Sequence, residues 1–124
     1  MALRTSSEYA EKLAGMEPNV YVGGRKISRD DEILRTPLNT IGFTFDAAAD
    51  PELSPLATAK SHLDGKVINR FTHVHRSIDD LMVKQEMTRV LCRKVGGCIQ
   101  RCMAADTLNA MGVVSKEIGD APGA

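Results

Sequence analysis

Two cysteines near the end of the chain, Cys98 and Cys102, are spaced so that they could bind one metal centre. Residues four apart lie one above the other on a helix, so both thiols would point the same way. Thiolates are the usual protein ligands of iron–sulfur clusters, and the pair could bind one metal ion or two irons of one cluster. The same spacing is also typical of two small buried apolar residues, because free cysteine is among the most buried residue types. The spacing alone leaves both interpretations open.

Few other soft donors could complete such a centre. They are Cys92, His62, His73 and His75. His73 and His75 could be neighbouring ligands on a strand, but we interpret them as polar residues of a loop. Three cysteines, in a compartment expected to be reducing, argue against a disulfide framework. The sequence shows no glycine-rich phosphate loop, nucleophile elbow or paired-carboxylate site.

The overall charge argues against some classes of partner. Sixteen basic residues balance sixteen acidic ones, so no net field attracts a polyanion, and we expect neither nucleic acid nor a membrane as a partner. No apolar run approaches the roughly 20 residues of a membrane span, and the first residues lack the apolar stretch of a secretory signal. We therefore expect a cytoplasmic protein whose partner is neutral or a second copy of itself.

The first half of the chain predicts short elements. Thr5 and Glu8 have the spacing of a capping box, and they predict a helix that ends near Gly15. Two extended runs around a pair of glycines predict a small β-hairpin near residues 20–27. A connecting loop is expected over 29–37, and a helix over 40–49.

The second half predicts longer helices. Residues 51–75 are expected to be irregular, with one brief helix around 54–60. Ser77 has the form of a helix cap, and the apolar residues after it predict a long amphipathic helix. Gly96 and Gly97 either break this helix or lie where no side chain fits. We expect Cys98 and Cys102 on one face of the helical segment that follows.

Several strings together resemble one enzyme family over about residues 6–118, and the most specific is the Cys-x-Gln-Arg-Cys motif. The strings are Val20–Val22 with Gly24, Lys60-Ser61, Gly65-Lys66, Ile68–Phe71, His75 with Ser77, Asp79–Leu81 and Cys98–Cys102. The chain resembles the 4-hydroxybutyryl-CoA dehydratase/vinylacetyl-CoA isomerase family, within a wider group that includes the flavin-using 4-hydroxyphenylacetate 3-monooxygenases. The hydroxylases of that group carry no cluster, so they have no need of two thiols there.

The resemblance implies a homotetrameric enzyme with an acyl-CoA-dehydrogenase-like fold. The chain would be the N-terminal helical domain of this enzyme and would be mainly α. Residues 1–124 would then be an incomplete part of a larger enzyme, and this part would be inactive alone. The implied cofactors are FAD, for which no residue here can be assigned, and a [4Fe–4S] cluster held by three cysteines and one histidine. Cys98 and Cys102 match two of these cysteines, and the other two ligands lie beyond position 124. The implied reaction dehydrates 4-hydroxybutyryl-CoA to crotonyl-CoA and isomerises vinylacetyl-CoA to the same product.

Two residues between the cysteines, Gln100 and Arg101, have candidate roles beside the cluster. Gln100 is the candidate catalytic residue, because its side chain could form a hydrogen bond near the substrate or the cluster. On an ideal helix, however, it would point about 100–200° away from both thiols. Arg101 could be a charge behind the ligands or a surface residue, and we expect it at the surface.

Two alternatives remain open at the level of the sequence. The chain could be part of a two-component, FAD-dependent 4-hydroxyphenylacetate 3-monooxygenase, in which the two cysteines are incidental. It could also be a small helical interaction protein that catalyses nothing. Iron content separates the first interpretation from both alternatives.

Overall fold

The capping box near the start of the chain is present as predicted. In this computed structural model, which describes residues 3–120, α1 (Ser6–Ala14) begins after Thr5. The Thr5 hydroxyl accepts a hydrogen bond from the Glu8 amide at 3.2 Å, and the Thr5 amide donates to the Glu8 carboxylate at 2.8 Å. Two amides that a helix start leaves unpaired are therefore satisfied by side chains.

The predicted hairpin at residues 20–27 is confirmed. β1 (Val20–Val22) pairs antiparallel with β2 (Arg25–Ile27). Gly23 and Gly24 connect them, both with positive φ, a conformation that two-residue hairpin turns of this kind require and glycine adopts freely.

The predicted boundary between the next loop and helix is wrong. A short 3₁₀ helix η1 (Glu32–Leu34) leads directly into α2 (Arg35–Asp46), which begins five residues before the predicted start at Thr40. Pro37 was expected to stay outside the helix. It lies instead in the first turn, where its missing amide hydrogen has no intrahelical partner to lose.

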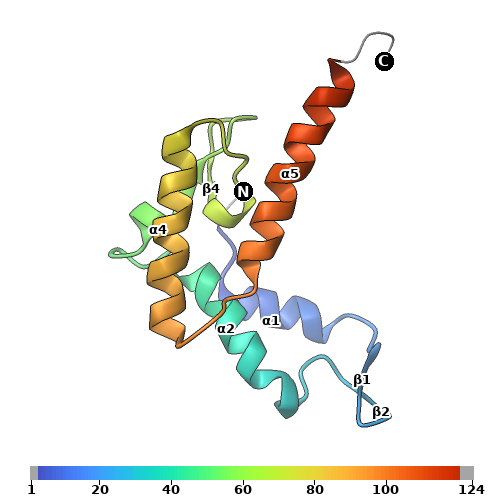
Figure 1. The fold of residues 1–124 in the computed structure, drawn as a ribbon. Helices are drawn as coiled ribbons and strands as arrows, with labels where there is room; N and C mark the ends of the chain where they lie inside the picture. The colour runs from blue at the N-terminus through green and yellow to red at the C-terminus, as the bar shows by residue number, and fades with distance from the viewer. Residues whose placement is uncertain (1–2, 121–124) are drawn as a thin grey trace.

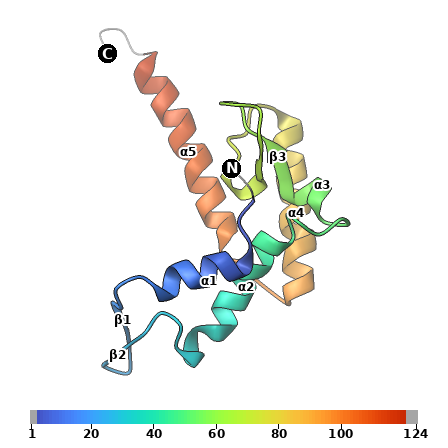
Figure 2. The ribbon, with the colours of Figure 1, turned by 180° about the vertical axis from the view of Figure 1, so that it is seen from behind.

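Helices α1 and α2 pack closely at the lower part of the molecule (Figures 1 and 2). The Ser6 amide donates to the Asp46 carboxylate at 2.9 Å, and the rings of Tyr9 and Phe45 stack with centroids 4.9 Å apart. Gly42 permits this approach, because a Cβ at its position would lie only 3.0 Å from the Ser6 Cβ. The absent side chain thus sets the distance between the two helices.

Substituting alanine at two helical glycines should have opposite effects. Gly42→Ala is expected to lower the free energy of unfolding by about 1 kcal/mol or more, since overpacking outweighs the gain in helix propensity. Gly112→Ala is the matched control, because its new Cβ would meet the Val74 side chain at an ordinary 3.4 Å. That variant should be stabilised by about 0.5–1 kcal/mol. Urea unfolding of the three proteins measures both effects, and a stabilised Gly42→Ala variant would contradict the packing argument.

The region after α2 contains a second hairpin that was not predicted. The brief helix is present as α3 (Ser54–Ala57) and is shorter than expected. It is followed by β3 (Thr58–Lys60), which pairs antiparallel with β4 (Val67–Asn69). A 3₁₀ helix, η2 (Arg70–Thr72), then turns the chain toward the long helices.

The two long helices are separated by a short irregular connection. α4 (Ile78–Val95) begins after Ser77, whose hydroxyl accepts from the Asp80 amide at 3.1 Å, and this predicted cap is confirmed. α4 ends at Gly96 in the left-handed conformation, so the glycine pair breaks the helix. α5 (Arg101–Gly119) follows, and its last turns project away from the rest of the molecule in both views (Figures 1 and 2).

The core lies where α2, α3, η2 and the two long helices meet. Its buried hydrophobic residues are Ala47, Ala48, Leu53, Ala57, Phe71, Met87, Leu91, Ile99 and Ala105. The expected apolar stripe of α4 is only partly inside, because Ile78 and Met82 are 79% and 62% exposed. The buried face of α4 instead consists of Lys84, Met87 and Leu91.

The mainly α class with a hairpin near residues 20–27 is confirmed for the described residues. Within residues 3–120, no helix combines the length and apolar composition that crossing a bilayer needs. The acyl-CoA-dehydrogenase-like fold and the single domain over 1–124 stay predictions, and residues 1–2 and 121–124 of that domain lie outside the described residues.

Candidate functional site

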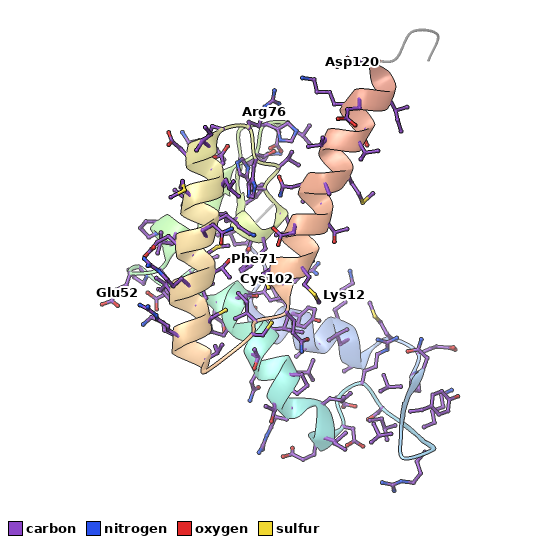
Figure 3. The ribbon with its side chains drawn as sticks, in the orientation of Figure 1. Lys12, Glu52, Phe71, Arg76, Cys102 and Asp120 are labelled. Atoms are coloured by element: carbon purple, nitrogen blue, oxygen red, sulfur yellow. The ribbon has the colours of Figure 1, made fainter. Side chains whose placement is uncertain are left out.

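Cys98 and Cys102 lie at the junction of the two long helices, but not on one helix as predicted. Cys98 belongs to the connection that follows Gly96. Cys102 is the second residue of α5 (Figure 3). The helix starts later than expected because Gln100, its N-cap, has φ of 59°, which no continuous right-handed helix contains. The two thiols nevertheless lie near enough for Cys98 to raise the pKa of the Cys102 thiol.

The two thiols differ in exposure and in their polar contacts. Cys98 is exposed and Cys102 is half-buried, so Cys98 does not fit the interpretation of a small buried apolar residue. The Gln100 amide donates to the Cys98 sulfur at 3.3 Å. Burial raises the pKa of the Cys102 thiol, and the adjacent Cys98 raises it further. Two thiolates this close repel each other, and a bound cation would offset that repulsion.

The residues between the cysteines alternate between exterior and interior. Gln100 is exposed, whereas the Ile99 side chain is 0% exposed and belongs to the core. The left-handed conformation of Gln100 costs a residue with a Cβ roughly 1–2 kcal/mol, and such strain is concentrated at functional sites. Its carboxamide makes no capping hydrogen bond to the helix start.

The expectation that Arg101 lies at the surface is wrong. Its Nη1 donates to the Thr44 hydroxyl at 2.7 Å, and its guanidinium carbon lies 4.2 Å from the centroid of the Phe45 ring and 4.8 Å from that of Phe71. Burial lowers its pKa to about 10, which leaves it protonated at neutral pH. The sequence offered one weak signal, since Phe45 and Phe71 are two of only three phenylalanines.

The remaining soft donors do not complete a ligand set. Across residues 3–120, no three or more histidine, cysteine, aspartate or glutamate side chains converge in a way that could hold a metal ion. Cys92 is half-buried on α4 and packs against the core. The chain therefore presents a pair of thiols rather than a full metal site.

His73 and His75 lie in a loop, as we interpreted them. The Nε2 atom of His73 is 3.2 Å from the Asp80 carboxylate, and the His75 amide donates to the Asn109 side chain at 2.6 Å. Asn109 in turn donates to the carbonyl of His73 at 3.2 Å. These contacts fasten the loop between η2 and α4 to the middle of α5.

The pKa of His75 should make stability decline in mild acid. Burial lowers this pKa from its ordinary 6.5, with the nearby His73 as the second cause. The unfolded chain therefore binds the proton first, so folding stability falls as pH drops below the ordinary pKa. His75→Gln should flatten the fall in urea midpoint between about pH 7.5 and 5.5. Equal slopes for the two proteins would contradict this assignment.

Comparison with known protein families gives a match over nearly the whole chain. Residues 5–122 match the family model described as 4-hydroxyphenylacetate 3-hydroxylase N terminal. The chain belongs to this family.

Two proteins that are similar to this member of the 4-hydroxyphenylacetate 3-hydroxylase N-terminal family are named as dehydratases. The chain is 40% identical over 118 residues to the 4-hydroxybutyryl-CoA dehydratase/vinylacetyl-CoA-Delta-isomerase of Clostridium aminobutyricum, covering 94% of this chain and 24% of that protein. A solved structure, an oxygen-tolerant archaeal 4-hydroxybutyryl-CoA dehydratase from N. maritimus, superposes with a TM-score of 0.86 at 33% identity, covering 94% of this chain and 23% of the other. The resemblance found in the sequence is confirmed, and the chain spans about a quarter of the length of these relatives.

Proposed function

We propose that this chain is the N-terminal domain of an enzyme that dehydrates 4-hydroxybutyryl-CoA to crotonyl-CoA and isomerises vinylacetyl-CoA to the same product. The supporting observation is the thiol pair of Cys98 and Cys102, with one sulfur exposed, in a chain 40% identical to a dehydratase of that name. Two neighbouring thiolates suit adjacent positions on one iron–sulfur cluster.

The donor set fits half of the proposed cluster. When bound, a [4Fe–4S] cluster would supply a Lewis acid for the departing hydroxyl, and FAD would supply one-electron chemistry. Cys98 and Cys102 would provide two thiolate ligands, and the other two would come from polypeptide beyond this chain. We infer that the chain alone is inactive for this reason.

Gln100 would act as an orienting group in this enzyme. Its exposed carboxamide lies between the two ligands and makes no capping bond that would occupy it. A carboxamide both donates and accepts hydrogen bonds but is never an ionised base, so it would align the substrate oxygen rather than move a proton. The base that deprotonates the acyl-CoA would then belong to another part of the enzyme.

The proposal includes a homotetramer that works in the cytoplasm on acyl-CoA substrates. All three cysteines are free, which suits a reducing compartment. A tetramer would give the exposed apolar residues of the long helices, such as Met82 and Met111, a surface to pack against.

The test is the composition and activity of the full-length protein, purified without air. We expect iron and sulfide in a ratio near one, bound flavin, and conversion of 4-hydroxybutyryl-CoA to crotonyl-CoA. Flavin without iron or sulfide, and no dehydration, would reject the proposal.

The name of the family favours one second candidate, a two-component 4-hydroxyphenylacetate 3-monooxygenase. That enzyme would hydroxylate the aromatic ring with reduced FAD and oxygen and would contain no iron. Oxygen consumption dependent on 4-hydroxyphenylacetate would select it. Neither activity, with no cofactor bound, would leave a helical interaction protein.

A further inference from the structure

The segment that carries the thiol pair is held from behind by two side chains. Ile99 is fully buried in the core, and Arg101 reaches back to α2 and η2. Ile99 lies between the exposed Cys98 and Gln100, and Arg101 lies between Gln100 and the half-buried Cys102. The directions of the two sulfurs therefore depend on how firmly the two interior side chains are anchored.

Burying the charged guanidinium of Arg101 costs free energy of folding, so stability alone does not explain why an arginine occupies this position. Within residues 3–120, no carboxylate forms a salt bridge with it. The contacts it has are the Thr44 hydroxyl and the faces of Phe45 and Phe71, which stabilise a cation but replace only part of its hydration. Even a buried charge that has an ion-pair partner can often be replaced by apolar side chains of similar volume at no loss of stability, and Arg101 lacks such a partner among residues 3–120. The contacts do, however, fix the guanidinium plane against two separate elements.

We propose that Arg101 is a positioning residue that holds the sulfurs of Cys98 and Cys102 at a fixed separation and direction. It clamps the first turn of α5 onto the end of α2 through Thr44 and Phe45, and onto η2 through Phe71. The importance of Arg101 for a bound cluster rests on the proposed function. Its role in fixing the positions of the two sulfurs does not depend on that function.

The geometry can be tested without a cluster by using phenylarsine oxide. This probe forms two As–S bonds with two nearby thiols and releases one water. The protein used is the 124-residue chain, and every variant also carries Cys92→Ala. Cys98 and Cys102 are then the two thiols that can react with the probe. Affinity for the probe is measured by competition with a small dithiol, alongside the melting temperature.

The matched control is Arg70, another partly buried arginine. Its Nε donates to the Leu56 carbonyl at 2.6 Å and its Nη2 to the Thr58 carbonyl at 2.5 Å, so it anchors η2 to the segment around α3. Arg70→Met should lower the melting temperature and keep probe affinity within about twofold, whereas Arg101→Met should weaken affinity about tenfold through lost preorganisation. Arg101→Lys should recover part of the loss, because it keeps the charge but not the planar contact with both rings.

Several results would overturn the positioning role. One is an Arg101→Met variant with unchanged affinity, and another is an equal loss in Arg70→Met, which would reveal a general effect of stability. If Arg101→Met does not fold, Thr44→Val removes the hydroxyl that accepts from Arg101, together with the bond that this hydroxyl donates to the Ile41 carbonyl, and it should still weaken capture about threefold. Unchanged capture there would also overturn the role. Missing iron in the full-length protein would reject the proposed function while leaving these probe measurements as they are.

Discussion

Replacing Cys98 or Cys102 with alanine should remove the iron and sulfide from the complete enzyme, whereas Cys92→Ala should retain both. A cluster held by four protein ligands loses one thiolate in either variant, and within residues 3–120 no group of three or more cysteine, histidine, aspartate or glutamate side chains converges to make up the loss. The fold should survive. Cys98 is exposed, and alanine is a good helix former at the start of α5.

Iron content and melting temperature, measured together, separate a ligand from a packing residue. If Cys102 were only a small core residue, Cys102→Ala would cost about 1–2 kcal/mol of stability and change no metal. Cys92→Ala should show that packing effect, because the Cys92 side chain is half-buried against the core. Full iron content in either ligand variant would reject the assignment, and loss of iron in all three would indicate a general failure to assemble.

Local signals in the sequence were sufficient to predict the helices and turns whose ends are set by a capping side chain or by a glycine. Thr5 and Ser77 cap their helices through hydroxyl groups, as their spacing to an acidic residue predicted. Gly23, Gly24 and Gly96 also act through their own backbone freedom, because each has a positive φ. These features depend on neighbours in the chain, so a single sequence contains them.

The second hairpin depends on contacts far along the chain, which explains why it was missed. β4 ends at Asn69, whose side chain donates to the Thr44 carbonyl at 2.9 Å, 25 residues away. Arg70 then bonds to carbonyls in the α3–β3 region. Three-residue strands carry too short a pattern to be recognised by alternation.

The assignment of Cys98 and Cys102 as metal ligands stays a prediction, and the geometry expected for the pair was wrong. Spacing alone suggested a single helix, whereas the left-handed Gln100 delays the start of α5 until Arg101. That conformation is uncommon outside glycine, and no local signal in the sequence marks it. The interior position of Arg101 was missed for a related reason, because arginine is rarely buried without a carboxylate and its aromatic partners are distant in sequence.

A large loss of stability is expected for Met87→Ala. Met87 is 0% exposed and is the largest of the fully buried side chains. Four of the nine buried hydrophobic residues in residues 3–120 are alanines, so Met87 fills a large share of the core. Removing a buried methionine side chain costs about 2–5 kcal/mol, because the cavity closes only in part. A domain of this size has about 5–15 kcal/mol in total, so the variant should lose a large share of it.

Met82→Ala is the matched control, since Met82 lies on the same helix and is 62% exposed. Its free energy of unfolding should stay within about 0.5 kcal/mol of the parent chain. Urea unfolding of the three proteins, followed by circular dichroism, gives both values with a common slope if the folded states are alike. Equal losses at the two positions would mean that α4 turns a different face to the core, and the core cluster that contains both Leu91 and Ile99 would then be wrong as well.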